Sequence, residues 1–232
     1  MSEISEKQVI GDSLGVGIGV GAYGISFGAL ATASGLDVLQ TCLLSLVAFT
    51  GGSQFAFIGV VGAGGAPTAG ALTAVLLGGR NTFYGMSLAR LLDVRGWRRW
   101  ATAHLIIDES TAMAITRPTQ RLGRIGFYWT GLTIFLVWNL MTLIGALAGN
   151  AIGDPRAFGL DAVAAAAFLG LLWPRLDTTR SRLVALGGLL AALALVPLAP
   201  AGVPIIVGGL AAVAVGMLAG ADIAPSEDGE PR

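Results

Sequence analysis

Long runs without charged residues alternate with short polar segments along this chain. Three runs carry no charge at all, residues 13–36, 125–153 and 183–221, and each is longer than the roughly 20 residues that a helix needs to cross a bilayer. A fourth run, residues 38–89, carries a single charge, Arg80. This pattern predicts an all-α fold, a polytopic bundle of membrane helices.

Clusters of Gly, Pro, Ser and Asp, which favour turns, divide these runs into about seven hydrophobic spans. We place the spans at about 13–33, 38–62, 67–91, 125–149, 160–174, 182–199 and 203–220. Residues 1–221 then form one integral membrane domain, and the polar tail 222–232 is predicted to be disordered. Segments 38–62 and 100–116 have a second interpretation, in which they re-enter the membrane without crossing it.

Composition agrees with a membrane protein. Charged residues make up 12% of the chain and the mean hydropathy is +0.76, against roughly 25% charged residues in soluble domains. The 35 glycines suit the close packing of membrane helices. Residues 1–8 lack a basic region and a small-residue cleavage site, so we expect no removable signal peptide. Cys42 is the single cysteine, which excludes a disulfide framework within the chain.

The distribution of arginines indicates an orientation. Ten of them occupy the links after the third span, before the fourth, and between the fifth and sixth: Arg90, Arg95, Arg98, Arg99, Arg117, Arg121, Arg124, Arg175, Arg180 and Arg182. All ten share one side if residues 100–116 do not cross the bilayer. Short loops rich in Lys and Arg stay in the cytoplasm, so we expect the N-terminus outside and the C-terminus inside. If residues 38–62 re-enter, the N-terminus moves inside and six spans remain.

A weak internal repeat relates two halves of the chain, residues 13–91 and 125–220. Gly35-Leu36-Asp37 opens the second span and Gly159-Leu160-Asp161 opens the fifth, and each Asp can cap the helix that follows. At this offset Thr50-Gly51-Gly52 coincides with Trp173-Pro174, where the fifth span stops. Matching interrupted segments in inverted halves mark the binding sites of transporters. Chance similarity in a chain rich in Ala, Gly and Leu is the alternative.

A pair of glycines lies in the middle of the second span. Gly51 and Gly52 precede Ser53 and Gln54, and adjacent glycines weaken a helix enough to break it. A broken helix persists in lipid only where its freed backbone groups line a cavity or find partners. The N–H groups of a half-helix starting near Ser53 would favour a carboxylate, and Gln54 would add an amide contact. A continuous, closely packed helix is the alternative.

Arg80 lies deep within the third span. At about 1.5 Å per helical residue it is roughly 20 Å from Pro67 and roughly 15 Å from Arg90, a depth at which an Arg costs about 2.5 to 3.5 kcal/mol. Its rigid guanidinium fork matches a carboxylate, which belongs either to a substrate or to Asp108 or Glu109. Tyr84 shares its face one turn on. We expect this region to supply three substrate-binding residues, Arg80, Asn81 and Tyr84.

The short apolar segment 100–116 carries three titratable residues. His104 and Asp108 are four positions apart and share a face if the segment is helical, and Glu109 follows directly. Intramembrane acidic and His residues commonly mark proton relays, so we assign proton coupling to Asp108, Glu109 and His104. A cytoplasmic amphipathic helix with solvated charges is the alternative.

The sequence lacks the motifs of a metal site, a catalytic nucleophile and a phosphate-binding loop. A single His without a second His or Cys at ligand spacing predicts no metal site. Ser53 has no base partner for nucleophilic catalysis, and the glycine pairs follow no strand, as a phosphate loop would. We therefore expect neither an enzyme nor a cofactor, and no nucleic-acid partner. Trp138 and Asn139 lie in mid-span, where they either face the site or join helices.

Three stretches carry a family resemblance over nearly the whole chain. They are Ala-Phe-Thr-Gly-Gly-Ser-Gln-Phe at 48–55, Arg-Asn-Thr-Phe-Tyr-Gly at 80–85 with Ser-Leu-Ala at 87–89, and Asp-Glu at 108–109. Together they resemble the AzlC family, the large subunits of bacterial branched-chain amino acid exporters. The matched motifs put forward Gln54, Arg80, Tyr84, Asp108 and Glu109 as site residues. Many members have His after the Arg, where this chain has Asn81.

The resemblance implies a secondary-transporter subunit that exports leucine, isoleucine, valine and methionine, driven by an ion gradient that we take to be protons. It also implies a multi-pass location in the bacterial inner membrane and a second, small membrane subunit resembling AzlD. The main alternative is a channel-like pore, with its selectivity set near Gln54 and Arg80. A membrane-embedded enzyme is the third interpretation.

Overall fold

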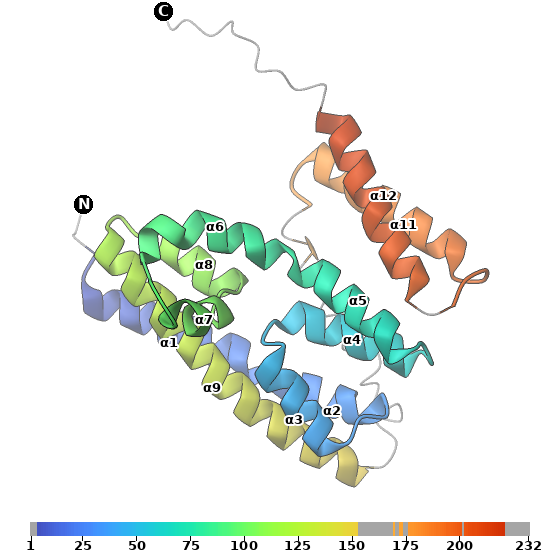
Figure 1. Cartoon of the computed structure of the whole chain (residues 1–232), viewed down its shortest axis with the longest axis horizontal. Coiled ribbons are helices and arrows are strands. Elements are labelled where there is room, and N and C mark those ends of the chain that lie inside the picture. The colour runs from blue at the N-terminus through green and yellow to red at the C-terminus, as the bar shows by residue number, and fades with distance from the viewer. Residues whose placement is uncertain (1–3, 153–168, 170–171, 174–175, 201, 221–232) are drawn as a thin grey trace, which may run out of the picture. The chain divides into compact units, whose positions relative to one another are not determined.

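The computed structural model describes residues 4–152, 169, 172–173, 176–200 and 202–220. Every regular element in these residues is helical (Figure 1), which confirms the predicted all-α class. The chain divides into two compact units, residues 1–165 and 166–232, and each is described by itself.

The first unit contains α1 to α9, and the second contains α11 and α12 (Figure 1). The helices of the first unit are α1 Glu6–Ala22, α2 Gly24–Ala33, α3 Val38–Val47, α4 Gly51–Gly62, α5 Pro67–Gly78, α6 Arg80–Leu92, α7 Arg98–His104, α8 Asp108–Ile115 and α9 Gln120–Ile152. Those of the second unit are α11 Thr179–Leu195 and α12 Val203–Gly220.

Two helical stretches of the described chain are long and apolar enough to cross a membrane, Glu6–Ala33 and Gln120–Ala151. They correspond to the first and fourth predicted spans. Shorter apolar helices cover Val38–Val47, Gly51–Gly62 and Val203–Leu218. The predicted count of about seven spans is therefore not confirmed. Most of the fifth predicted span, 160–174, lies outside the described residues.

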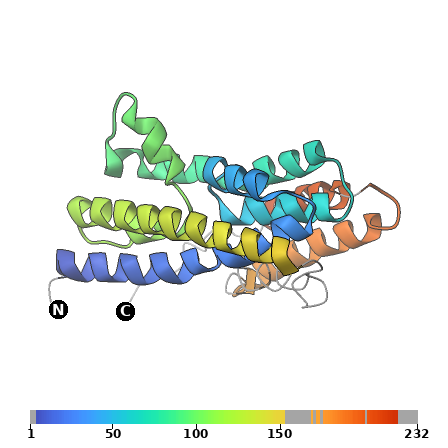
Figure 2. The ribbon, with the colours of Figure 1, turned by 90° about the horizontal axis from the view of Figure 1, so that it is seen from below.

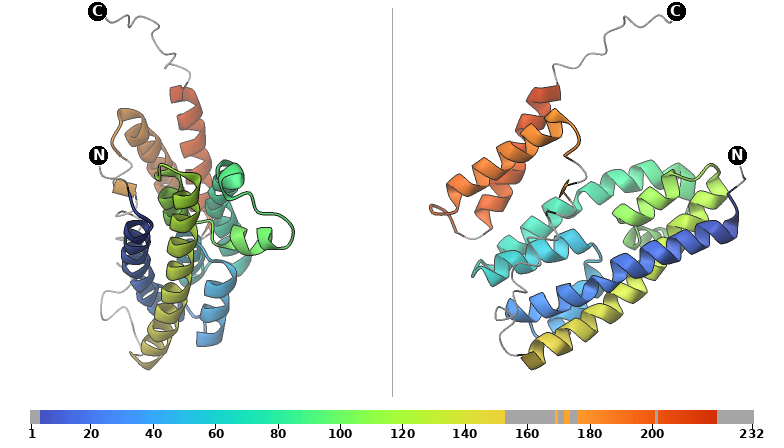
Figure 3. Two further views of the ribbon diagram at one scale, coloured as in Figure 1. Left: turned by 90° about the vertical axis from the view of Figure 1, so that its left-hand side faces the viewer. Right: turned by 180° about the vertical axis from the view of Figure 1, so that it is seen from behind.

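The two long stretches pack along each other through glycines. Gly17 lies against Thr133, Gly21 against Val137, and Gly28 against the backbone of Thr142, in each case too close to admit a Cβ atom. Small residues at such spacing let membrane helices approach closely. The paired residue numbers rise together, so α1–α2 and α9 run parallel, and Figures 2 and 3 show them side by side. These spans open the two proposed repeat halves, and their parallel course does not fit an inverted repeat.

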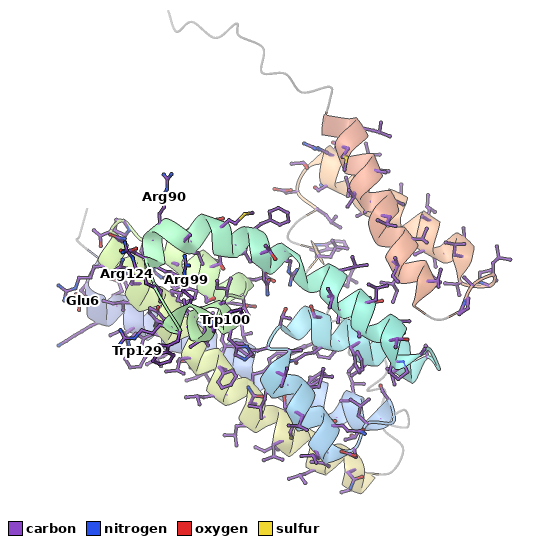
Figure 4. All side chains as sticks on the ribbon, viewed as in Figure 1. Glu6, Arg90, Arg99, Trp100, Arg124 and Trp129 are labelled. Atoms are coloured by element: carbon purple, nitrogen blue, oxygen red, sulfur yellow. The ribbon has the colours of Figure 1, made fainter. Side chains whose placement is uncertain are left out.

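The N-terminal end of α1 lies at the same end of this unit as the arginine-rich links. Glu6 Oε1 pairs with Arg121 Nε at 2.7 Å, and Asp12 Oδ2 pairs with Arg117 Nη1 at 3.1 Å. Figure 4 labels Glu6, Arg90 and Arg124 at this end. The expectation that the N-terminus lies opposite the arginines is therefore corrected. The second expectation, with both on one side, fits the ion pairs.

The second predicted span is broken, as the glycine pair indicates. Helix α3 ends at Val47, the N-cap residue Thr50 is extended (φ −157°, ψ 104°), and α4 begins at Gly51. Asp37 caps α3, because its Oδ1 accepts from the Gln40 N–H at 2.7 Å. The third predicted span is also divided, into α5 and α6. Gly79 at that junction keeps helical dihedrals (φ −55°, ψ −27°), so this interruption is a bend.

Residues 100–116 do not form one helix. Helix α7 ends at His104 and α8 begins at Asp108, with extended backbone at Ile107 (φ −131°, ψ 174°) between them. The predicted i, i+4 face shared by His104 and Asp108 is therefore wrong. Ser110 stabilises the break, because its Oγ donates to Leu105 O at 2.7 Å and accepts from the Ile107 N–H at 3.1 Å.

The second unit is a helical hairpin. Gly188 of α11 and Gly208 of α12 allow the two backbones to meet, since a Cβ atom on Gly188 would lie 3.0 Å from Gly208 O. Thr178 caps α11 by accepting from the Ser181 N–H at 3.1 Å. Arg180 Nη2 donates to Gly216 O at 2.8 Å, which ties the start of α11 to α12.

Candidate functional site

An ion pair joins α6 to α8. Arg80 is the first residue of α6 and Asp108 the first of α8, and Arg80 Nη2 lies 2.6 Å from Asp108 Oδ2. Tyr84 Oη, one turn along α6, donates to Asp108 Oδ1 at 2.7 Å. The side chains of Arg80 and Asp108 keep 30% and 23% of their exposure. The carboxylate that contacts Arg80 in this structure is therefore that of Asp108, one of the partners predicted for it.

The two interrupted spans meet beside this pair. A Cβ atom on Gly52 would lie 3.5 Å from Arg80 Nη2, and one on Gly78 would lie 3.1 Å from Ser53 Oγ. The first turn of α4 therefore faces the junction of α5 and α6. Of the residues predicted to bind substrate, the structure brings together Gly52, Ser53, Arg80 and Tyr84.

This junction concentrates positive charge. The N-terminus of α4 carries partial positive charge on its first N–H groups, which have no partner within the helix. The Thr50 side chain makes no capping hydrogen bond to them. The Arg80 guanidinium adds a full charge close by. The α4 N-terminus and the Arg80 guanidinium together favour the binding of an anion, and in this structure the anion is the Asp108 carboxylate.

Several buried polar atoms around the junction have no hydrogen-bond partner among the described residues. Ser53 Oγ is one, in a residue that is 2% exposed, and Arg80 Nε and Asn81 Oδ1 are two more. Buried polar atoms are normally hydrogen-bonded, so each exception calls for an explanation, of which a functional role is one. Hydrogen-bonding capacity therefore remains on both sides of the ion pair.

Gln54 lies in the same helix turn, and its amide is used within the break. Nε2 donates to Ala48 O at 2.9 Å and to Ser45 O at 3.3 Å. Oε1 accepts from Trp138 Nε1–H at 2.9 Å. Gln54 is 1% exposed. Both amide hydrogens are thus committed to the end of α3, which differs from the substrate contact predicted from the sequence.

His104 and Glu109 lie near the ion pair in sequence and have different surroundings. The His104 ring packs against Phe49 and Phe135, with ring centroids 5.8 Å and 5.6 Å apart. Glu109 follows Asp108 in the first turn of α8, where the helix dipole favours a carboxylate. Asn139, open to two interpretations, donates through Nδ2 to Phe135 O of its own helix at 2.7 Å.

A buried hydroxyl pair joins α3 to α9 and was not predicted from the sequence. Ser45 Oγ and Thr142 Oγ1 are 3.4 Å apart and both residues are fully buried. They are 97 positions apart in the chain, and Ser and Thr are common in membrane helices as hydrogen-bonding residues. The packing of α3 against α9 brings them together.

The fold and the site define a helical membrane protein with interrupted helices and an ion pair at their junction. Residues 15–152 match the family model described as AzlC protein. Because this match covers more than half of the chain, the protein belongs to the AzlC family. The resemblance predicted from the sequence is confirmed.

Curated relatives carry membrane names. Inner membrane protein YgaZ of Escherichia coli K12 is 29% identical, with 71% of this chain and 67% of that protein covered. An uncharacterized membrane protein of Haemophilus influenzae is 26% identical over 60% of this chain and 57% of its own length. One of Helicobacter pylori J99 is 24% identical, with 71% and 73% covered. The chain thus spans little more than half of the Haemophilus relative.

No solved structure matches this chain. The family and the names of the relatives support a membrane location and indicate a role in membrane transport.

Proposed function

We propose that this chain is a subunit of a secondary transporter in the bacterial inner membrane, where it crosses the bilayer several times. It exports leucine, isoleucine, valine and methionine in exchange for protons. The observation that carries the proposal is the Arg80–Asp108 ion pair beside the N-terminus of α4, at the junction of two interrupted helices. Interrupted helices whose N-termini face an anionic group of the substrate recur in secondary transporters.

The charges of the ion pair match those of an amino acid. An α-amino acid is a zwitterion, so its carboxylate can take Arg80 and the α4 N-terminus while its ammonium takes Asp108. One ion pair is then replaced by two, and no net charge is left unbalanced. Ser53 Oγ, buried beside Gly78 without a described hydrogen-bond partner, supplies a further donor for the carboxylate. The apolar side chain of the substrate forms no hydrogen bond or ion pair with these groups.

Proton coupling follows from the same acid. A proton and the substrate ammonium compete for the Asp108 carboxylate, so protonation releases the substrate and substrate binding requires the ionised form. Such competition is the requirement for exchange of one substrate outward against one proton inward. Because the zwitterion is neutral, each exchange moves one positive charge inward.

The test is uptake of labelled leucine into proteoliposomes that hold this chain and its partner subunit. An imposed pH gradient and an imposed potential should each drive accumulation above equilibrium. Leucinamide and N-acetyl-leucine, each lacking one charge, should fail to compete, whereas valine should compete. Equilibration without accumulation would indicate the channel-like alternative, and competition by both analogues would contradict the zwitterion site.

Asp108→Asn isolates the coupling step. The amide cannot bind a proton or pair fully with an ammonium, so leucine exchange should weaken and lose its dependence on pH. Glu109→Gln is the matched control, because Glu109 is the neighbouring acid in the same helix turn. If Glu109→Gln removes the pH dependence and Asp108→Asn keeps it, Glu109 is the coupling acid.

We also propose that a small membrane subunit resembling AzlD completes the transporter. One face of α1 supports this partner: Cβ atoms on Gly11, Gly15 and Gly19 would meet no atom within 4 Å. Their four-residue spacing provides a flat face for another membrane helix.

Gly15→Leu should abolish co-purification of the small subunit without lowering the membrane abundance of this chain. Gly59→Leu serves as the matched control on α4, at another position where a Cβ atom would meet nothing within 4 Å. Unchanged co-purification in Gly15→Leu would place the partner elsewhere.

A further inference from the structure

The break between α3 and α4 leaves carbonyl groups that need partners. The last carbonyls of a helix have none within the helix, and lipid provides none. The Ala48 N–H still bonds to Leu44 O at 2.9 Å, so the carbonyls from Ser45 onward lose their partners within the helix, and Ala48 O also accepts from the Thr50 N–H at 2.7 Å. Gln54 reaches back from α4 to two of them, Ser45 O and Ala48 O. It therefore caps the C-terminal end of α3 from the neighbouring helix.

Trp138 fixes the orientation of that amide. Its indole N–H donates to Gln54 Oε1, which leaves the amide nitrogen turned to the carbonyls. The ring stacks on Phe27, with centroids 6.3 Å apart and planes at 24°, and meets Phe55 edge-on at 6.3 Å. Trp138 is 5% exposed and lies on α9, which has 33 residues and is the longest described helix.

The same indole limits the first turn of α4. A Cβ atom on Gly51 would lie 3.0 Å from Trp138 Cη2, so the ring edge lies directly against this residue. Gly52 and Ser53, the next two residues, face Arg80 and Gly78. A shift of α4 against Trp138 would therefore change the distance between the α4 N–H groups and the guanidinium.

We propose that Gln54 and Trp138 form a latch that holds the α4 N-terminus in register with Arg80. Both are positioning residues: they set the affinity of the site for substrate without touching the substrate. The consequence for transport rests on the proposed function, whereas the consequence for the break itself does not.

The transport arm compares Trp138→Phe, Gln54→Met and the double variant in the transporter with its partner. Trp138→Phe should raise the leucine concentration for half-maximal exchange by about fivefold, the effect of one neutral hydrogen bond. Gln54→Met, which also loses the two bonds to α3, should raise it at least as much, and both should keep the maximal rate within about twofold. The double variant should match Gln54→Met, because that change already breaks the hydrogen bond to Trp138. A substrate contact by Gln54 predicts the opposite pattern, in which Trp138→Phe leaves the affinity unchanged or the two effects multiply.

Two control variants separate the hydrogen bond from packing. Trp129→Phe makes the same substitution on α9, at a residue that is 44% exposed (Figure 4). Phe27→Leu weakens the ring stack on Trp138 and keeps the indole N–H. Both should retain the wild-type affinity. A loss in Phe27→Leu equal to that in Trp138→Phe would assign the effect to packing and overturn the latch.

A labelling arm tests the break without any substrate. Thr50→Cys, in a background where Cys42 is replaced by Ala, places one thiol in the break. A small membrane-permeant maleimide should label it several times faster in Trp138→Phe than in Trp129→Phe or the parent. Faster labelling in a protein that exchanges no amino acid would keep the latch and reject the proposed function. Equal labelling in all three would overturn the latch, and Trp138→Phe, a conservative change, decides this even if Gln54→Met fails to fold.

Discussion

Replacing Arg80 separates the structural role of the ion pair from its role in binding. Arg80→Lys keeps a positive charge and loses the planar fork that contacts a carboxylate at two points. Arg80→Gln and Asp108→Asn each remove one charge and leave the other without its counter-charge at 2.6 Å. The double variant Arg80→Gln/Asp108→Asn removes both charges, so no ion is left without its partner.

The size of the effect follows from burial. Removing one partner of a fully buried pair costs about 3 to 5 kcal/mol. Here the two side chains keep 30% and 23% of their exposure, so solvent screens part of the charge. We therefore expect about 1.5 to 3 kcal/mol, the range of a hydrogen bond to a charged group. The same loss of transition-state or substrate binding lowers the exchange rate by about 10- to 100-fold.

Two measurements on each variant distinguish the roles. Thermal unfolding in detergent should show lower stability in each charge-removing single variant and partial recovery in the double variant. Leucine exchange in proteoliposomes should fall by about 10- to 100-fold in all of them, and in Arg80→Lys at nearly wild-type stability. Wild-type exchange by Arg80→Lys, or restored exchange in the double variant, would refute the binding role and leave a purely structural pair.

Three further predictions concern packing, topology and the second acid. Gly28→Leu should destabilise the protein by about 1 to 3 kcal/mol, because its side chain meets the Thr142 backbone, whereas Gly19→Leu, in open space, should unfold at the parent temperature. Cysteines at Ser5, Gly96 and Thr179 should all resist an impermeant external thiol reagent in intact cells; labelling of Ser5→Cys alone would restore an outside N-terminus. Glu109→Gln should retain pH-dependent leucine exchange within about twofold of the parent, and loss of pH dependence would contradict the assignment of Asp108.

Local signals in the sequence predicted the breaks that matter. The Gly51–Gly52 pair in an apolar run predicted the interruption of the second span, because each glycine lowers helix stability by about 1 kcal/mol relative to alanine. Asp37 predicted the start of α3 and caps it, and in the structure Gln40 completes the capping box by accepting from the Asp37 N–H. The depth of Arg80 predicted a carboxylate partner, and the structure supplies Asp108.

Features that depend on tertiary structure could not be predicted from residue spacing alone. His104 and Asp108 are four residues apart, and a helical face was the simplest interpretation, but Ser110 bonds to the backbone at Leu105 and Ile107 and stabilises a break there. Ser and Thr side chains compete for backbone groups in this way. The predicted side of the N-terminus failed for a related reason. Its position depends on how many times the chain crosses between Asp12 and Arg117, which no local pattern determines.

The role predicted for Gln54 from its motif was incomplete. A polar residue behind two glycines in mid-membrane signals a site, and the family resemblance placed it there as well. The structure adds that a broken helix must satisfy its own carbonyls before it can bind anything, and Gln54 does so with both amide hydrogens. The N–H groups of Gly51 and Gly52 at the start of α4 are donors instead of acceptors, so they favour an anion as their partner. Within the first turn of α4, Gln54 thus stabilises the break, whereas the N–H groups of Gly51 and Gly52 face Arg80. For that reason, substitutions at Gln54 and at the two glycines should differ in their effect on the affinity for substrate.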